Sequence, residues 1–232
     1  MNSVFKLFVF IILAVVAVYF YGTNSMKKKQ LEQEYKAALH AAATYKVQIP
    51  DVPPVEDLGL PDDVMVRLHK SLHSRNVEEA GKAMDLLWKV QDPEVIPVMN
   101  KKLAAKRDNC WSDCANITPM KMKVLEIVER DVSQINFEFL CKAIHDRNKE
   151  VRMRAVTALT KYLTDDAVDA MNKLMNDSDP EVRTAAIEGV MNIKNGIKDM
   201  RNAQIMAVEK EYKKKMFFKE RISPEAIMET LN

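Results

Sequence analysis

The chain has 232 residues, enough for one or two ordinary domains with a buried core. Apolar residues make up 47% and charged residues 29%, so the chain as a whole is not expected to be disordered. Only 5 residues are glycine and 7% are aromatic, which argues against glycine-rich phosphate loops and large β-sandwiches or barrels. Lys and Arg total 35 against 33 Asp and Glu, so the overall charge indicates no nucleic-acid partner.

The N-terminal segment predicts a membrane anchor. Residues 4–21 form an apolar run interrupted only by Lys6, and a helix of that length spans about 27 Å, close to the hydrocarbon thickness of a bilayer. Three aromatic residues end the run, where a belt at the membrane interface is expected. A cleaved signal peptide is the alternative, but no small-x-small cleavage site follows the run. We therefore expect residues 1–26 to be a single-pass transmembrane anchor that contacts the lipid bilayer.

The sequence leaves the side of the membrane open. Lysines are more numerous after the span than before it, and this bias favours a cytoplasmic body. A disulfide between Cys110 and Cys114 would instead need an oxidising compartment, the periplasm or a lumen.

Residues 27–61 are expected to hold a juxtamembrane helix and a linker. Within residues 30–46, apolar residues at spacings of three and four form a short heptad-like seam, typical of a stalk helix or of self-association. The seam comprises Leu31, Tyr35, Ala38, Ala42 and Tyr45. Residues 47–61 hold four of the nine prolines, which predicts an extended, semi-rigid linker and a domain boundary.

An internal repeat follows the linker. Residues 146–159 align with residues 177–190 at an offset of 31 (177 minus 146), which is the repeat offset of the chain. The identical pairs are Glu150 and Glu181, Val151 and Val182, Arg152 and Arg183, and Ala155 and Ala186. An aspartate at or near the N-cap, an acidic residue in the first turn and apolar residues at helical spacing predict that each segment begins a helix.

Further amphipathic helices complete a series of pairs. Helices at residues 135–145 and 165–175 precede the two repeat helices, and an earlier helix begins near Asp92. The others are expected at residues 62–74, 77–90 and 120–130. An irregular, polar insertion at residues 106–118 interrupts the series.

These helix pairs, with Asp-Pro-Glu-Val-Arg after the turn at residue 179, resemble HEAT repeats, especially the phycobilisome-lyase-type HEAT-like variety. The resemblance covers residues 62–193. It implies an α-solenoid of about four helix pairs. We therefore expect an all-α fold in which the transmembrane helix and stalk predicted above precede this solenoid. The resemblance also implies that Arg152 and Arg183 form a structural ladder with turn aspartates, and that the groove of the solenoid binds another macromolecule.

Residues 194–232 are expected to cap the solenoid. A long helix is predicted over residues 197–222, and Ser223-Pro224 then signals a last short helix. Basic and aromatic residues interleave in the long helix. Those that would contact a membrane surface or an acidic partner are Lys213, Lys214, Lys215, Phe217 and Phe218. In the alternative, the phenylalanines pack on the last repeat and the lysines are solvated.

No residue set in the sequence predicts catalysis or a cofactor. Cys110 and Cys114 lack a second Cys/His pair for zinc, and Cys141 is expected in the core. His69 and His73 share a helix face, as metal-binding pairs do, but no carboxylate lies between them. No catalytic triad, P-loop or dinucleotide motif is present, so we expect a protein that is not an enzyme and holds no metal.

The insertion is the strongest sequence signal for a partner. Lys106, Arg107 and Trp111 combine the residue types that anchor interfaces with a position that solenoids use for binding. In the alternative, Trp111 folds back onto the repeats. We therefore expect a membrane-tethered scaffold or adaptor that binds a protein through the groove or the insertion. The alternatives are a metal-binding or catalytic HEAT-like protein, and a nucleic-acid-binding module.

Overall fold

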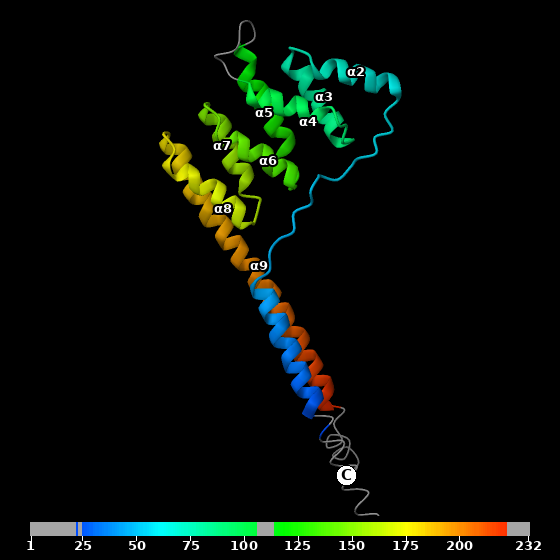
Figure 1. Cartoon of the computed structure of the whole chain (residues 1–232), viewed down its shortest axis with the longest axis vertical. Helices are drawn as coiled ribbons and strands as arrows, with labels where there is room; N and C mark the ends of the chain where they lie inside the picture. Colours follow the sequence, from blue (N-terminus) through cyan, green and yellow to red (C-terminus); the bar gives the residue numbers. More distant parts are fainter. Residues whose placement is uncertain (1–21, 23–24, 106–113, 222–232) are drawn as a thin grey trace, which may run out of the picture. The chain divides into compact units, whose positions relative to one another are not determined.

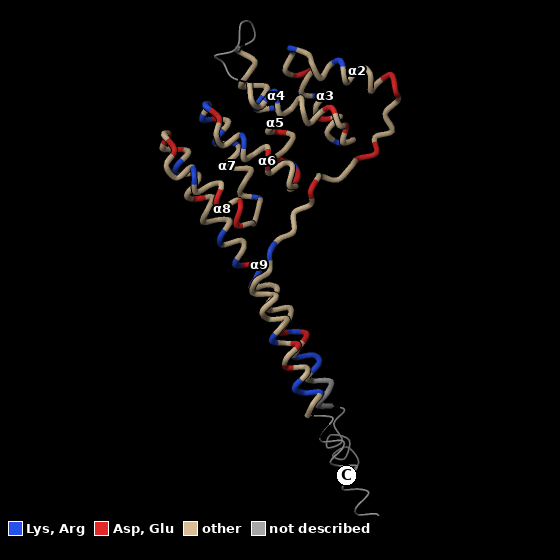
Figure 2. The backbone as a smooth tube through the Cα atoms, in the orientation of Figure 1, with Lys and Arg blue, Asp and Glu red and all other residues tan. Residues whose placement is uncertain are grey.

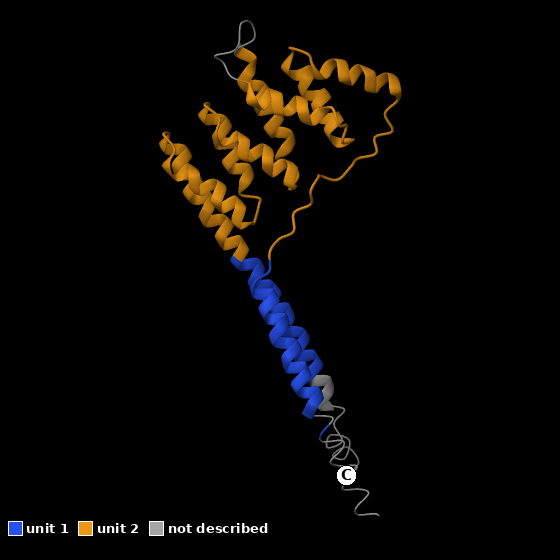
Figure 3. Cartoon of the chain, in the orientation of Figure 1, with its two compact units in different colours: residues 1–45, 198–232 blue, residues 46–197 orange. Residues whose placement is uncertain are grey.

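The computed structural model describes residue 22, residues 25–105 and residues 114–221 (Figure 1). Throughout these residues the regular elements are all helical, which confirms the predicted all-α class. The chain divides into two compact units (Figure 3). Unit 2 comprises residues 46–197, and unit 1 comprises residues 1–45 and 198–232.

Unit 2 consists of helix pairs stacked as an α-solenoid. Second helices of neighbouring pairs pack on one another, α3 on α5 and α5 on α7, and the first helix α4 packs on α6. The first pair is α2 (Asp62–Leu72) and α3 (Val77–Lys89). The second is α4 (Val95–Ala104) and α5 (Ile117–Val128), with the short helix η2 (Cys114–Asn116) before α5, and the third is α6 (Gln134–Ala143) and α7 (Lys149–Leu159). The fourth is α8 (Asp165–Asn172), extended by η3 (Lys173–Asn176), and the start of α9 (Pro180–Arg221).

Side-chain caps fix where the helices of the solenoid begin. The Asn148 side chain accepts hydrogen bonds from the Glu150 and Val151 N–H groups at the start of α7. Asp146, two residues earlier, accepts the Asn148 N–H at 2.9 Å. Each cap satisfies backbone donors that have no partner inside the helix. The repeat aspartate therefore shapes the turn, and the following Asn148 is the N-cap.

One continuous core runs through the solenoid, and close approach of the helices needs small residues. A Cβ atom added to Gly189 of α9 would lie 2.7 Å from Sδ of Met171, a fully buried side chain of α8. Tyr162 is also buried, with its hydroxyl 3.2 Å from the Ser133 carbonyl oxygen. Burial raises the pKa of Tyr162 to about 12. The first contact packs α9 on α8, and the second ties the segment after α7 to the residue before α6.

The proline-rich segment at residues 46–61, here called the strap, has no regular secondary structure but is bound to the solenoid. The N–H groups of Gln134 and Ile135, at the start of α6, donate to the carbonyl oxygens of Pro50 (2.8 Å) and Asp51 (3.1 Å). The N–H of Glu56 donates to the Lys89 carbonyl oxygen at 2.8 Å. The sequence predicts a semi-rigid spacer, whereas the segment satisfies backbone groups of two helix pairs.

Unit 1 pairs a helix at residues 25–43 with the later part of α9. The ring of Tyr35 stacks on Tyr212 with centroids 4.1 Å apart, and Arg201 Nε donates to the Tyr45 carbonyl oxygen at 3.2 Å. Residue 45 meets residue 201 and residue 35 meets residue 212, so the two helices are antiparallel. The predicted stalk seam is therefore in contact with the same chain.

The predicted localisation as a single-pass membrane protein is wrong. Among the residues that the structure describes, none of the helices is long and apolar enough to cross a bilayer. The predicted span, residues 4–21, lies outside the described residues.

Candidate functional site

Most of the sequence-predicted partner residues lie outside the described part of the chain. Lys106, Arg107, Cys110 and Trp111 belong to the segment between residues 105 and 114, which the structure does not describe. Cys114 lies in η2, but its side chain is also outside the description. The predicted disulfide and the predicted contact through Trp111 therefore stay predictions.

The basic cluster predicted near the C-terminus lies on α9 within unit 1. Lys213, Lys214 and Lys215 are exposed and close to the last described turn of the helix (Figure 2). Phe217 and Phe218 follow in the same helix, with their side chains outside the description. The contact of this cluster with a membrane surface or an acidic partner stays a prediction.

The histidine pair does not form a metal site with other described residues. His69 Nε2 lies 3.0 Å from Oδ2 of Asp92, so this ring ties α2 to the turn before α4. In the described ranges, no three or more His, Cys, Asp or Glu side chains are grouped to hold a metal ion. Cys141 is half-buried against the core, and burial raises the pKa of its thiol.

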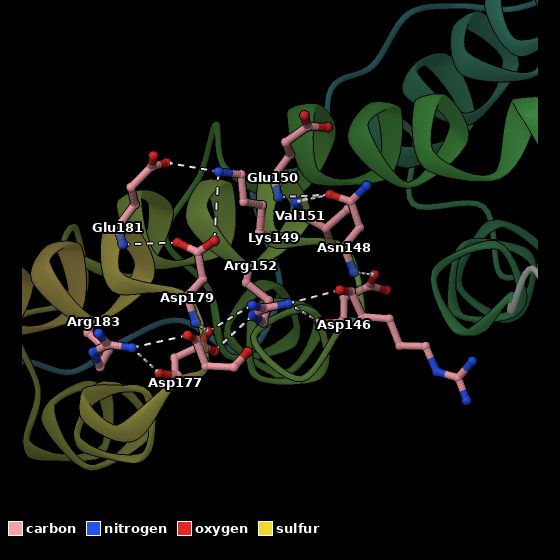
Figure 4. Close-up of polar contacts among 12 residues, drawn as sticks. Asp146, Asn148, Lys149, Glu150, Val151, Arg152, Asp177, Asp179, Glu181 and Arg183 are labelled. Atoms are coloured by element: carbon pink, nitrogen blue, oxygen red, sulfur yellow. Dashed lines mark hydrogen bonds and ion pairs between the residues drawn. The ribbon is translucent and has the colours of Figure 1, made fainter.

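The regular spacing of the repeat builds a ladder of side chains along one edge of the solenoid (Figure 4). Arg152 Nε and Nη2 donate to the two carboxylate oxygens of Asp177 at 2.9 and 2.8 Å. Arg152 Nη1 donates back to the Asp146 and Arg147 carbonyl oxygens, at 2.9 and 3.0 Å. Arg152 thus closes its own turn and also binds the turn of the following repeat. Its hydrogen bonds to the Asp177 carboxylate lower the pKa of Asp177.

The ladder extends one repeat further towards the N-terminus with a different cation. Lys121 precedes Arg152 by one repeat offset, and its ammonium donates to Asp146, which precedes Asp177 by the same offset. Both side chains are at least nine-tenths buried. The sequence identifies Asp146 as a repeat aspartate, but it does not identify Lys121, because the sequence around Thr118-Pro119 departs from the repeat. The repeat offset was the signal that could have found the pair.

The last position of the ladder is Arg183, and its environment differs. Arg183 Nη1 donates to the Asp177 and Ser178 carbonyl oxygens at 2.7 and 3.1 Å, which reproduces the turn-closing half of the Arg152 pattern. Across the described residues, no carboxylate accepts from its Nε and Nη2 side. One repeat offset after Asp177 the chain has Val208, which cannot accept such a bond.

Apolar positions beside the ladder show the same change at the last repeat. Leu125, Val156 and Ile187 are equivalent, because each follows the one before it by the repeat offset. Their side chains are 0%, 1% and 46% exposed, respectively. Met191, one turn beyond Ile187, is 60% exposed, whereas its counterpart Thr160 is half-buried beside Gly189 of the following helix. Among the described residues, Ile187 and Met191 therefore lack the neighbours that bury the equivalent positions in earlier repeats.

Four side chains define this surface, which we call the end strip: Arg183, Ile187, Met191 and Lys194. They recur at spacings of three and four, so they share one face of α9. The end strip carries two cations and two large apolar groups, and no acidic residue belongs to it. Of these residue types, Arg and Met are enriched in protein interfaces relative to other surfaces.

A comparison with protein-family models supports this repeat architecture. No curated protein matches the chain. The protein-family model for HEAT repeats matches residues 137–205. This range includes most of α6, the Arg152–Asp177 pair and the end strip.

Proposed function

We propose that this protein is a non-catalytic scaffold or adaptor that binds another protein through the end strip. The observation that carries the proposal is the exposure of Ile187, whose counterparts Leu125 and Val156 are buried, together with the exposure of Met191 one turn further along α9. Stacked repeats bury their apolar faces on neighbours, and a terminal repeat normally has a polar outer face. A terminal face with two large exposed apolar side chains favours a protein partner.

Ion pairs at the second helices of the pairs make those helices a less favourable binding surface than the end strip. Arg154 forms two hydrogen bonds to Glu129, at 3.0 and 2.6 Å, and Arg130 pairs with Asp85. These side chains already satisfy one another between neighbouring repeats, so a partner there would have to replace existing ion pairs. HEAT repeats commonly mediate contacts between proteins, and the insertion at residues 106–118 is a second candidate surface.

Photocrosslinking from the end strip tests the proposed function. Benzoylphenylalanine is placed at residue 191 of the full-length chain in cells of its native source, and the products are analysed by mass spectrometry. Position 206 is the matched control, because Met206 lies on the same helix and is 69% exposed. We expect a covalent adduct with another protein from position 191 and none from position 206.

Two results would contradict the proposed function. One is the absence of any protein adduct from position 191. The other is an identical set of adducts from positions 191 and 206, which would show that exposure on α9 alone determines crosslinking.

A further inference from the structure

The ladder specifies the chemistry of the partner as well as its place. Arg152 uses one side of its guanidinium to close its own turn, and the other side to hold Asp177 of the following repeat. Arg183 also closes its own turn, but within the described chain it makes no bond to a carboxylate of a following repeat. A guanidinium with one side fixed against its own turn is preorganised for a carboxylate on the other side.

We propose that the partner is a helical protein that continues the solenoid, and that it places an aspartate or glutamate from a turn between two helices on Arg183. This inference rests on the proposed function, because it names the partner chemistry for the same end strip. The carboxylate would take the place that Asp177 takes at Arg152, and an apolar helix face would cover Ile187 and Met191 as α9 covers Thr160. Lys194 adds a second cation to the strip, which complements an acidic turn.

The first repeat of the chain argues that the partner is a different protein. A second copy stacked head to tail would present its own first turn, where Ser74 occupies the position of Asp146 and Asp177. The Ser74 hydroxyl accepts the Asn76 N–H at 3.1 Å, as Asp177 accepts the Asp179 N–H at 2.9 Å. A serine hydroxyl carries no charge, and here it also donates to Glu79 at 2.7 Å. A second copy would therefore meet Arg183 with a hydroxyl in place of the aspartate, and the nearby Glu79 carboxylate already accepts hydrogen bonds from Ser71 and Ser74, both at 2.7 Å.

Substitutions at Arg183 in the crosslinking chain test the inference. We expect Arg183→Ala to reduce the adduct from position 191 by about tenfold or more, because a hydrogen bond to a charged group is lost. Arg183→Lys keeps the positive charge but loses the two-point geometry, and we expect an intermediate loss. Arg67→Ala is the matched control, since Arg67 is exposed on α2 and pairs only locally with Asp63. It should leave the adduct unchanged.

Two further readouts separate the inference from the proposed function. Thermal denaturation shows whether the Arg183→Ala chain still folds. If it does not fold, the adduct of the Arg183→Lys chain is compared with that of the unsubstituted chain instead. Sequencing of the crosslinked peptide should place an aspartate or glutamate in a turn between two helices of the partner. An adduct that is insensitive to both Arg183 variants, or a crosslinked peptide without an acidic turn, would overturn the inference and leave the proposed function intact.

The identity of the crosslinked chain also discriminates between occupants. An adduct between two copies of this chain, or one with residues 222–232 of the same chain, would overturn the assignment to a different helical protein. Absence of any adduct would overturn the proposed function and the inference together.

Discussion

At the scale of single residues, the Arg152–Asp177 pair is a buried, bidentate contact between two neighbouring repeats. Both side chains are about nine-tenths buried, and the bond is bidentate at 2.8 to 2.9 Å. Removing one partner leaves the other charge buried without compensation, which costs about 3–5 kcal/mol. We expect Asp177→Ala to lower the free energy of unfolding by about this amount in chemical denaturation.

An exposed pair provides the control for that prediction. Asp63 and Arg67 on α2 lie 2.6 Å apart, but their side chains are 65% and 78% exposed. Exposed pairs contribute no more than about 1 kcal/mol because water and salt screen them. Equal destabilisation by Asp63→Ala and Asp177→Ala would contradict the assignment of Asp177 as a rung that joins repeats.

The same pair predicts a dependence of stability on pH. Hydrogen bonding from Arg152 holds the pKa of Asp177 below its ordinary value of about 4 in the folded chain. The ionised carboxylate therefore stabilises the fold above pH about 4, and this contribution is lost as the pH falls through the lowered pKa. We expect the difference in melting temperature between the wild type and Asp177→Asn to be full at pH 6 and to shrink towards pH 3. A difference that stays constant over this range would argue against the ionised pair.

At the scale of elements, the strap is expected to hold two helix pairs together. Ile49 packs on the core while Val55, on the same strap, is 62% exposed. We expect Ile49→Asp to release the strap, because a charge cannot be buried there without a partner. Hydrogen exchange of the Gln134 and Ile135 amides, which donate to strap carbonyls, should then accelerate by about tenfold or more.

The matched substitution for this prediction is Val55→Asp. It adds the same charge to the strap at a position that faces solvent, so exchange at Gln134 and Ile135 should stay at the wild-type rate. Acceleration by both variants, or by neither, would show that the strap does not protect the start of α6.

The elements differ in how far the sequence predicts them. Periodicity and cap residues predict α2, α3 and α7 to within about two residues, because local patterns determine where these helices start. The sequence does not predict that the strap is hydrogen-bonded to the solenoid, since those bonds use backbone groups and leave no trace in residue identity. It also does not predict that α9 runs unbroken from Pro180 to Arg221 past Asn195-Gly196, a pair of residues typical of a helix end.

The sequence likewise predicts only part of the candidate site. The internal repeat indicates Arg152 and Arg183 as equivalent residues, and this structural interpretation is confirmed at Arg152 by its bonds to Asp177. The sequence does not predict the end strip, because the exposure of Ile187 depends on what packs beside it, whereas its residue type is apolar like that of the buried Leu125 and Val156. The insertion around Trp111, the strongest sequence signal, lies outside the described residues.

At the scale of the whole molecule, the repeat pattern ends within α9, before that helix itself ends. Lys121, Arg152 and Arg183 follow one another at the repeat offset, and Val208 occupies the position where the next turn aspartate would stand. Among the described residues, the apolar side chains of Ile187 and Met191 are left exposed at this end of the repeats. The proposed partner would complete the stack at the end strip.

Oxidative footprinting of methionines tests this central claim most directly. Met191 and Met206 are 60% and 69% exposed on one helix, and Met171 is fully buried, so the purified chain should oxidise at the first two and not at the third. In native extract, the account predicts that Met191 becomes protected severalfold while Met206 keeps its rate. Equal oxidation of Met191 and Met206 in the purified chain and in the extract would contradict the account.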